Sequence, residues 1–538
     1  MNTRLQPAPK HRPQGRRQRP PPRRPVRRQR EQGFGRLLAL LLILTGLILV
    51  WRSGGVGSLF EAEPAARPEP VIAPTVPDAV QPTVEPRQRP WRPQGPINRD
   101  FPGLTTFRGN ATRSYYGEGP LPKRPSILWR YPRAGKMCML SENLGTSKLW
   151  CGTGWTGQPN VIPNEDGGVE VRFGAYDGKY HFLNGRTGAT VRPALKTGDL
   201  AKGSATSDPD GYPLYYAGSR DNRLRVVALD RATPTVLWSL DANRSVSRPV
   251  WNDDWDGAPL VIGDYLLEGG ENSWFYVIRL NRRYNRYGYV EVNPRVVMRV
   301  PGYDRQLFRD LKDRDVSIES SVAFRNGVAY FANSGGLVQG WDISDVLKGG
   351  TRYRRVFRYW VGDNVDASVV IDRQGYLYVA RHAERNVKRV NPLADSVGTL
   401  IKLDPRNPRR PLVWSAHVGS TAPGGGILST PALYDGVVYV TEIEGGLFGV
   451  DHKTGKVLYG VDIPAATWMS PVPTNNQLLI ADCGGMLRNF DISEPRKRPK
   501  ELWTLQLPGC IESTPAVWKG MIWLGTRDGA MYAIGEDT

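Results

Sequence analysis

The chain has few side chains of the kinds that bind transition metals. Its 538 residues include four cysteines and five histidines, with neither a C-x-x-C nor a C-x-x-C-H motif. Structural zinc and covalent haem depend on such clusters, so the sequence speaks against both. It also contains no H-E-x-x-H motif and no evident Ser-His-Asp arrangement, and we therefore assign no catalytic residue.

Residues 1–36 have almost no apolar side chains, which excludes a packed core there. They contain eleven Arg and one Lys against Glu31 alone, together with seven Pro. This composition predicts a disordered basic tail, which carries over half of the net charge of +20. Such an arm can bind nucleic acid. The next segment explains the charge better, so we expect no nucleic-acid partner.

An uncharged run of fifteen residues, 37–51, lies between Arg36 and Arg52. At ~1.5 Å per residue it is shorter than the ~30 Å hydrocarbon core unless Arg52 snorkels and the residues up to 58 extend it. A signal-peptide core is the alternative, although no small-x-small cleavage site follows closely. We predict a single transmembrane helix at 37–58, with the Arg-rich N-terminus cytoplasmic and the rest extracytoplasmic at the cell membrane.

The segment 59–100 is rich in proline, with ten prolines between residues 61 and 100. It predicts a semi-rigid spacer that sets a distance from the membrane. The remaining residues, 101–538, are expected to form the folded domain.

Residues 101–538 repeat one phrase. A tight turn such as Asp435-Gly436 comes first, and a second turn such as Gly445-Gly446 follows, each between runs rich in Val, Tyr, Ile and Leu. These pairs favour the positive φ angles of hairpins, so each repeat predicts four antiparallel strands. A Ser-Pro or Ser-Thr-Pro phrase precedes the first turn, and three of its prolines lie 40 and 44 residues apart: Pro431, Pro471 and Pro515.

That spacing is typical of β-propeller blades. Eight units are expected, and the last is one strand short because the sequence ends. Ser126–Pro132 has the same Leu-Trp ending as the fourth strands of other units. The sequence thus predicts an all-β, eight-bladed propeller closed by an N-terminal strand. The units start near Gly152, Lys202, Ser245, Ser317, Asp366, Leu428, Met469 and Glu512.

In an oxidising compartment the four cysteines predict two disulfides, and four buried thiols are the alternative. Cys483 falls at the second-to-third turn of the seventh unit, and Cys510 falls in the loop that enters the eighth. Both positions belong to one face of a propeller, so this pair can meet. Cys138 and Cys151 flank the start of the first unit on that same face.

The segment "LTTFRGNATRSYYGEGPLPKRPSILWRYP", together with "GGLFGVDHKTGKVLY" and "DGAMYAI", resembles the repeats of quinoprotein-type propellers. That group includes pyrroloquinoline quinone (PQQ) dehydrogenases and the propeller lipoprotein of the bacterial outer-membrane assembly machine. The resemblance covers about residues 101–538 and implies the fold. It does not decide function, because members with and without the quinone share the phrase. The dehydrogenases have adjacent cysteines beneath the quinone, and no Cys-Cys pair occurs here.

One loop has carboxylates at the spacing of calcium sites. Asn252, Asp254 and Asp256 precede Gly257, and alternate oxygen ligands can wrap a calcium ion. Leu260 stands where such loops usually place a further carboxylate, so a plain first-turn hairpin is the alternative. We read the loop as the first turn of its unit.

Three acids occupy equivalent positions on the inner strands: Glu319, Asp366 and Glu512. Serines recur on the same strands. This pattern predicts a central channel with an acidic arc that binds a cation or a basic peptide, or a solvated channel without a ligand.

An insert at 280–315 is rich in Arg and Tyr, residue types enriched at protein interfaces. Its interface candidates are Arg282, Arg283, Tyr284, Tyr287 and Tyr289. A solvated flap is the alternative.

We therefore predict a membrane-anchored extracytoplasmic scaffold that binds an envelope protein, peptide or glycan without catalysis. No cofactor is required by this hypothesis. A PQQ-dependent dehydrogenase, with quinone and calcium in the channel, is the alternative.

Overall fold

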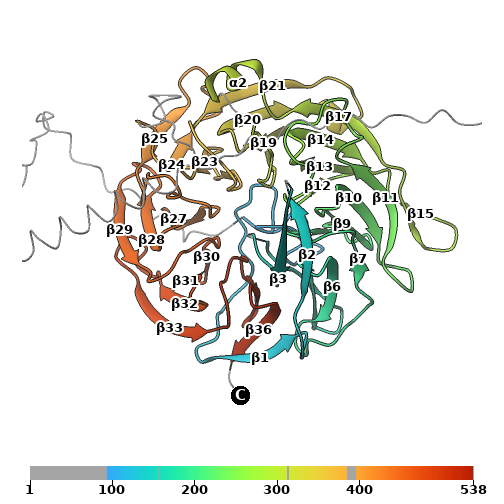
Figure 1. Ribbon diagram of the computed structural model, residues 1–538, viewed down its shortest axis with the longest axis horizontal. Coiled ribbons are helices and arrows are strands. Elements are labelled where there is room, and N and C mark those ends of the chain that lie inside the picture. Colours follow the sequence, from blue (N-terminus) through green and yellow to red (C-terminus); the bar gives the residue numbers. More distant parts are fainter. Residues whose placement is uncertain (1–93, 144, 156, 312–313, 385–395, 537–538) are drawn as a thin grey trace, which may run out of the picture. The chain divides into compact units, whose positions relative to one another are not determined.

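The computed structural model describes residues 94–538 except 144, 156, 312–313, 385–395 and 537–538. Within the compact unit Arg87–Thr538, eight four-stranded antiparallel sheets are arranged around a common centre (Figure 1). The predicted eight-bladed propeller is confirmed. The strands of blades one to three are, in order, β4 (Asn160–Pro163), β5 (Val169–Ala175), β6 (Lys179–Asn184) and β7 (Leu195–Lys196) in blade one; β8 (Thr206–Ser207), β9 (Leu214–Ala217), β10 (Arg223–Ala228) and β11 (Thr235–Asp241) in blade two; and β12 (Leu260–Ile262), β13 (Tyr265–Gly269), β14 (Trp274–Arg279) and β17 (Arg295–Pro301) in blade three. Those of blades four to six are β18 (Ala323–Arg325), β19 (Val328–Phe331), β20 (Leu337–Asp342) and β21 (Arg354–Trp360) in blade four; β22 (Val370–Ile371), β23 (Leu377–Ala380), β24 (Leu400–Leu403) and β25 (Leu412–Ala416) in blade five; and β26 (Ala432–Tyr434), β27 (Val437–Glu442), β28 (Gly446–Asp451) and β29 (Val457–Asp462) in blade six. Those of the last two are β30 (Val472–Thr474), β31 (Gln477–Ala481), β32 (Met486–Asp491) and β33 (Lys500–Gln506) in blade seven, and β34 (Ala516–Trp518), β35 (Met521–Thr526), β36 (Ala530–Glu536) and β1 (Pro125–Tyr131) in blade eight.

The eighth blade joins the two ends of the propeller sequence. Strand β1 pairs antiparallel with β36, in a register that sets Pro125 opposite Glu536 and Tyr131 opposite Met531. The Nε1–H of Trp129 in β1 also donates to the carbonyl of Gly185 in blade one, at 2.9 Å. The predicted closing strand is thus confirmed, and this pairing leaves the last blade no free edge at β36.

The tight turns follow from local sequence. In blade six, Asp435 and Gly436 have φ angles of 43° and 79°, which a type I′ hairpin requires at both central positions. Asn326 and Lys519 take the corresponding conformation before glycine in blades four and eight. We call the side of the ring that carries these turns, between the first and second strands, the first-turn face.

Two hairpins, a short helix and a 3-10 turn stand outside the blades in the described part of the chain. β2 (Cys138–Asn143) and β3 (Thr146–Cys151) form one hairpin, and β15 (Arg283–Tyr284) and β16 (Val290–Glu291) form another. A short helix, α2 (Arg305–Leu311), buries Leu307 and Leu311. A 3-10 turn, η1 (Val346–Lys348), follows β20. Figure 1 shows β2 and β3 near the centre of the ring and β15 at its periphery.

The predicted tail at 1–36, the predicted anchor at 37–58 and most of the proline-rich segment lie outside the described residues. Among the residues that are described, no helix combines the length and apolar character needed to cross a bilayer. The end of the proline-rich segment packs on the propeller. Thr112 Oγ1 donates to Gln94 Oε1 at 2.6 Å, and Ile97 lies against the core between blades three and four.

Candidate functional site

The segment 104–118 closes the centre of the ring. Its backbone forms hydrogen bonds with the inner strands or adjoining residues of five blades. The bonded pairs are Leu104 with Val161, Thr105 with Ser207, Ala111 with Phe324, Thr112 with Ile371, and Glu118 with Val517. Because one short segment contacts so many blades, it acts as a plug that holds their inner strands in place.

Two arginines of the plug extend these contacts. Arg113 donates from Nε to the carbonyl of Val322 at 2.8 Å and from Nη2 to the carbonyl of Ala258 at 2.9 Å. Arg108 donates from Nη2 to the carbonyl of Thr430, also at 2.9 Å. Both side chains are fully buried. The guanidinium groups therefore satisfy carbonyls that would otherwise be buried without partners.

Glu319, Asp366 and Glu512 lie at equivalent places. Each residue comes four positions before the inner strand of its blade, in the connection and not in the strand itself. Ser334 Oγ lies 3.3 Å from Glu319 Oε1 and 3.4 Å from Asp366 Oδ1. Glu512 instead pairs with Arg527, whose Nη1 lies 3.3 Å from Glu512 Oε2.

Two small cavities connect these acids. Asp366 and Glu512 line one cavity with Trp155, Leu428 and Trp468. The second is lined by Phe107, Trp155, Gly157, Ser204, Asp256, Glu319, Ser321, Asp366 and Ser368. Trp155 and Asp366 belong to both, so the cavities are neighbours. Each has room for about one water molecule. The centre is thus acidic, as the aligned acids suggest, but narrow.

Burial disfavours charge on these acids. It raises the pKa of Asp366 to about 8, with Glu384 as the next largest cause. Burial and then Asp366 also raise the pKa of Glu319 well above its ordinary value. The protonated form of Asp366 is therefore favoured at neutral pH. The two cavities that these acids line leave no substrate-sized space beside them among the described residues.

The loop with calcium-like spacing is not a first turn. Residues 252–256 lie in the connection from β11 to β12, whereas the first turn of that blade is Gly263-Asp264. The assignment to a first turn is therefore wrong. It failed because a long blade-to-blade connection can carry the same Asp-Gly signal as a hairpin.

A lysine occupies the centre of that carboxylate group. Asp254, Asp256 and Glu271 each place a carboxylate oxygen within reach of a common cation. The Nζ of Lys202 contacts all three, at 3.3 Å from Asp254, 3.1 Å from Glu271 and in close contact with Asp256. Burial lowers the pKa of Lys202, but the three carboxylates outweigh it and raise that pKa well above its ordinary value. Asn252 does not face this group as an oxygen ligand, since its Nδ2 donates to Glu271 at 2.6 Å.

The recurring serines fasten strands to one another. Ser429 Oγ donates to the carbonyl of Thr441 at 3.0 Å, and Ser513 Oγ donates to that of Gly525 at 2.8 Å. Ser470 Oγ accepts from the backbone N–H of Thr430 in the preceding blade at 2.9 Å. The Ser-Thr-Pro phrase therefore serves blade packing.

The four cysteines form two disulfides in the structure, Cys138–Cys151 and Cys483–Cys510. The first closes the base of the β2–β3 hairpin, which the sequence analysis did not identify. The second links the turn between β31 and β32 to the connection from β33 to β34.

The Arg/Tyr insert forms the β15–β16 hairpin and displays three tyrosines. Tyr284, Tyr287 and Tyr289 are 52%, 69% and 47% exposed. Arg283 is also exposed and pairs with Glu291 at 3.1 Å. Tyr284 stacks on Tyr212 of blade two, with 5.4 Å between the ring centroids. This contact holds the hairpin against the propeller.

Arg282 does not belong to this exposed surface. Its side chain is 5% exposed, and it reaches Asp208 at 2.6 Å, Asp210 at 3.0 Å and Asp264 at 3.3 Å. It therefore anchors the hairpin to the first turns of blades two and three. The pattern of Arg and Tyr could not separate this buried residue from its exposed neighbours.

Comparisons with known proteins agree with this architecture. Residues 397–498 match the model of a family described as outer membrane protein assembly factor BamB. Together with the eight-bladed fold, this match supports the predicted PQQ-like repeat propeller. The crystal structure of BamB from Moraxella catarrhalis is similar, with a TM-score of 0.51 and 13% identity over 74% of this chain and 100% of that one. The computationally designed Ika8 protein gives a TM-score of 0.49 and 13% identity over 71% and 97%. No curated protein sequence matches the chain.

The sequence patterns did not indicate the central roles of six residues: Arg108, Arg113, Trp155, Lys202, Glu271 and Trp468. Arg108 and Arg113 stand in the quoted segment that carries the family resemblance, so that segment gave a signal of their position. Lys202 and Glu271 lie in different blades and share no local motif. Only the closed ring brings them together.

Proposed function

We propose that this PQQ-like repeat propeller is a non-catalytic binding and scaffold module that engages an envelope protein. The observation that carries the proposal is the closed centre. Beside the plug at 104–118, the acids Glu319, Asp366 and Glu512 line two cavities, and each cavity has room for about one water molecule. A module of this build offers its faces and hairpins to a partner.

The BamB family model supports an envelope context. Its description names a factor in the assembly of outer membrane proteins, and the similar solved structure is also a BamB. We propose by analogy that the partner here is a protein of the cell envelope. The uncharged run at 37–51 and its arginine-rich flank support a single-pass anchor with the propeller extracytoplasmic.

A quinone does not fit the centre of this ring. PQQ is a flat tricyclic molecule with three carboxylates, and the central cavities have room for about one water each. The cations Lys202 and Arg527 are already paired with carboxylates.

The β15–β16 hairpin is the surface we propose for partner recognition. Exposed tyrosines combine apolar area with a hydroxyl, and a rigid base limits the entropy lost on binding. Its anchor is Arg282, bound to three carboxylates. The hairpin therefore presents Tyr284 and Tyr287 in a fixed arrangement.

Two measurements on the full-length protein, one in intact membranes and one after purification in detergent, test the proposal. Crosslinking in intact membranes is expected to trap an envelope protein, and a Tyr284→Ala/Tyr287→Ala variant is expected to trap much less of it. The exposed Tyr353, on the loop after η1, gives a matched control in Tyr353→Ala. Incubation with PQQ and Ca²⁺ should produce no bound-quinone absorbance and no alcohol or sugar oxidation with an artificial acceptor. Quinone uptake with turnover would overturn the proposal.

A further inference from the structure

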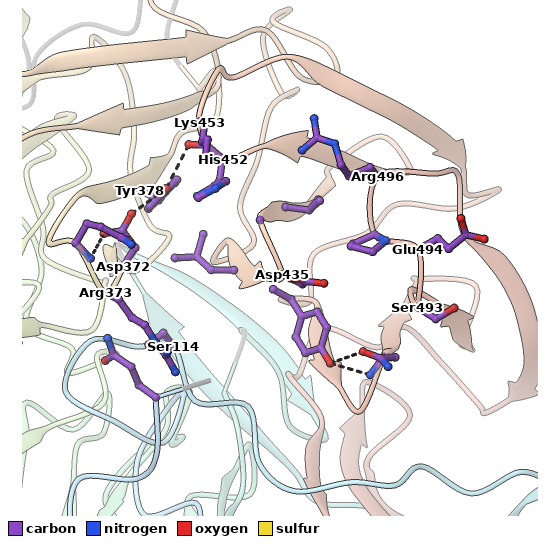
Figure 2. Close-up of a pocket in the computed structure, with 18 of the residues that line it drawn as sticks. Ser114, Asp372, Arg373, Tyr378, Asp435, His452, Lys453, Ser493, Glu494 and Arg496 are labelled. Atoms are coloured by element: carbon purple, nitrogen blue, oxygen red, sulfur yellow. Dashed lines mark hydrogen bonds between the residues drawn. The ribbon is translucent and has the colours of Figure 1, made fainter. Parts of the chain in front are cut away.

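A groove of about 1160 Å³ crosses the first-turn face over blade six. Figure 2 shows Asp435 near its middle, with Asp372 and Arg373 on one side and Glu494 and Arg496 on the other. The first side is the turn of blade five between β22 and β23. The second is the connection between β32 and β33 in blade seven.

Loop lengths explain why the groove is there. The first turn of blade six has only two residues, Asp435 and Gly436, between β26 and β27. The turns on either side are longer, spanning 372–376 in blade five and 492–499 in blade seven. A tight turn between two longer loops leaves a depression, and Leu433, Tyr434 and Pro495 contribute to its lining.

Most charges around the groove are already paired. Arg496 binds Asp451 closely, Lys497 binds Glu494 closely, and Asp372 lies 3.9 Å from Lys402. Two lining cations, Arg373 and Lys453, are exposed and have no ion-pair partner among the described residues. They come from adjacent blades, five and six. These two side chains can therefore bind a negatively charged group in the groove.

Size and lining indicate the kind of ligand. The groove exceeds the roughly 300–1,000 Å³ typical of small-molecule sites. Its tyrosines do not present free ring faces for a sugar to stack on, since Tyr378 is fully buried and Tyr434 is 9% exposed. An extended peptide alternates its side chains, so acidic groups at every second position can face the two cations. The lining also offers apolar atoms to the other side chains.

We propose that this groove binds an extended acidic segment of a partner protein, held by Arg373 and Lys453. The proposal rests on the proposed function, because it assigns a second contact surface to the same binding module. Asp435 lies near the middle of the groove and rejects an acidic side chain there, so it selects which peptide positions carry the negative charge.

Fluorescence anisotropy on the full-length protein tests the groove. The probe is a labelled octapeptide that alternates Glu and Leu. We expect saturable binding below about 1 mM that weakens as NaCl is added. The variant Arg373→Glu/Lys453→Glu should weaken it about tenfold or more. The control Arg309→Glu/Lys348→Glu reverses two exposed cations outside the groove, and it should change the affinity less than about twofold.

Four results would overturn the groove proposal. The peptide does not bind, the two double variants weaken binding equally, or an oligogalacturonate binds more tightly than the peptide. Equal binding of a Lys-Leu octapeptide would also refute the role of the two cations. Quinone-dependent turnover would instead refute the proposed function and leave a positive groove result standing. Conversely, if the peptide does not bind but the Tyr284→Ala/Tyr287→Ala variant still traps much less of the envelope protein, only this inference is refuted.

Discussion

The centre of the ring and its first-turn face use charged side chains in opposite ways. At the centre, burial raises the pKa of Asp366 to about 8 and the pKa of Glu319 above its ordinary value. On the first-turn face, burial also raises the pKa of Asp451, but hydrogen bonds from Thr454 and Arg496 prevail and lower it to about 2. At the centre, burial thus disfavours the charged form of these acids. On the first-turn face, hydrogen bonds favour the charged form of Asp451.

The plug should be the most sensitive part of the centre. Arg113→Met removes the donors to Val322, Ala258 and Phe107 and leaves their carbonyls buried. We expect a loss of about 3–6 kcal/mol in the free energy of unfolding, measured as a shift of the urea midpoint. The exposed Arg309→Met serves as control. A shift no larger than that of the control would show that the plug does not stabilise the ring.

Arg282 is the exception on the first-turn face, because it is buried there among Asp208, Asp210 and Asp264. Arg282→Ala should cost about 3 kcal/mol, since it leaves a buried Asp208 without its cation. It should also expose the β15–β16 hairpin to proteolysis. The neighbouring Arg283→Ala, whose partner is exposed, should leave the protease pattern as it was. If both variants behave alike, the comparison between buried and exposed arginines fails.

The central acids predict a dependence of stability on pH. Asp366 has a raised pKa in the folded state, so the folded protein binds more protons than the unfolded chain between about pH 4 and pH 8. Stability therefore falls as the pH rises through this window. Asp366→Asn should remove part of that fall, on the order of 1–3 kcal/mol between pH 5 and pH 9. This prediction is contradicted if the melting temperatures of the variant and the wild type change with pH by the same amount.

The smallest effect on stability is expected at the tip of the hairpin. Tyr287 is 69% exposed, so Tyr287→Ala should change the free energy of unfolding by no more than about 0.5 kcal/mol. Its effect should be on crosslinking to the partner, where it contributes apolar contact area. Tyr287→Phe, which keeps the ring, should retain most of the crosslinking. A destabilised Tyr287→Ala variant would place this residue in the structural core of the insert.

The blade architecture could be predicted because its signals are local. Asp435-Gly436 needs only the geometry of two residues to specify a hairpin, and the spacing of Pro431, Pro471 and Pro515 gives the period. The closing strand β1 could be predicted because the last unit lacked a strand. The position of residues 252–256 could not, since a connection between blades and a turn within one can share the same residues.

The sequence by itself determined the repeat, the number of blades, the closing strand and the equivalence of Glu319, Asp366 and Glu512, because each depends on short-range pattern or on counting. Only the tertiary structure decided that Lys202 fills the carboxylate group, that Arg282 is buried while Tyr287 is exposed, and that a groove lies over blade six. These features depend on side chains from different blades, and their distances are set only when the ring closes.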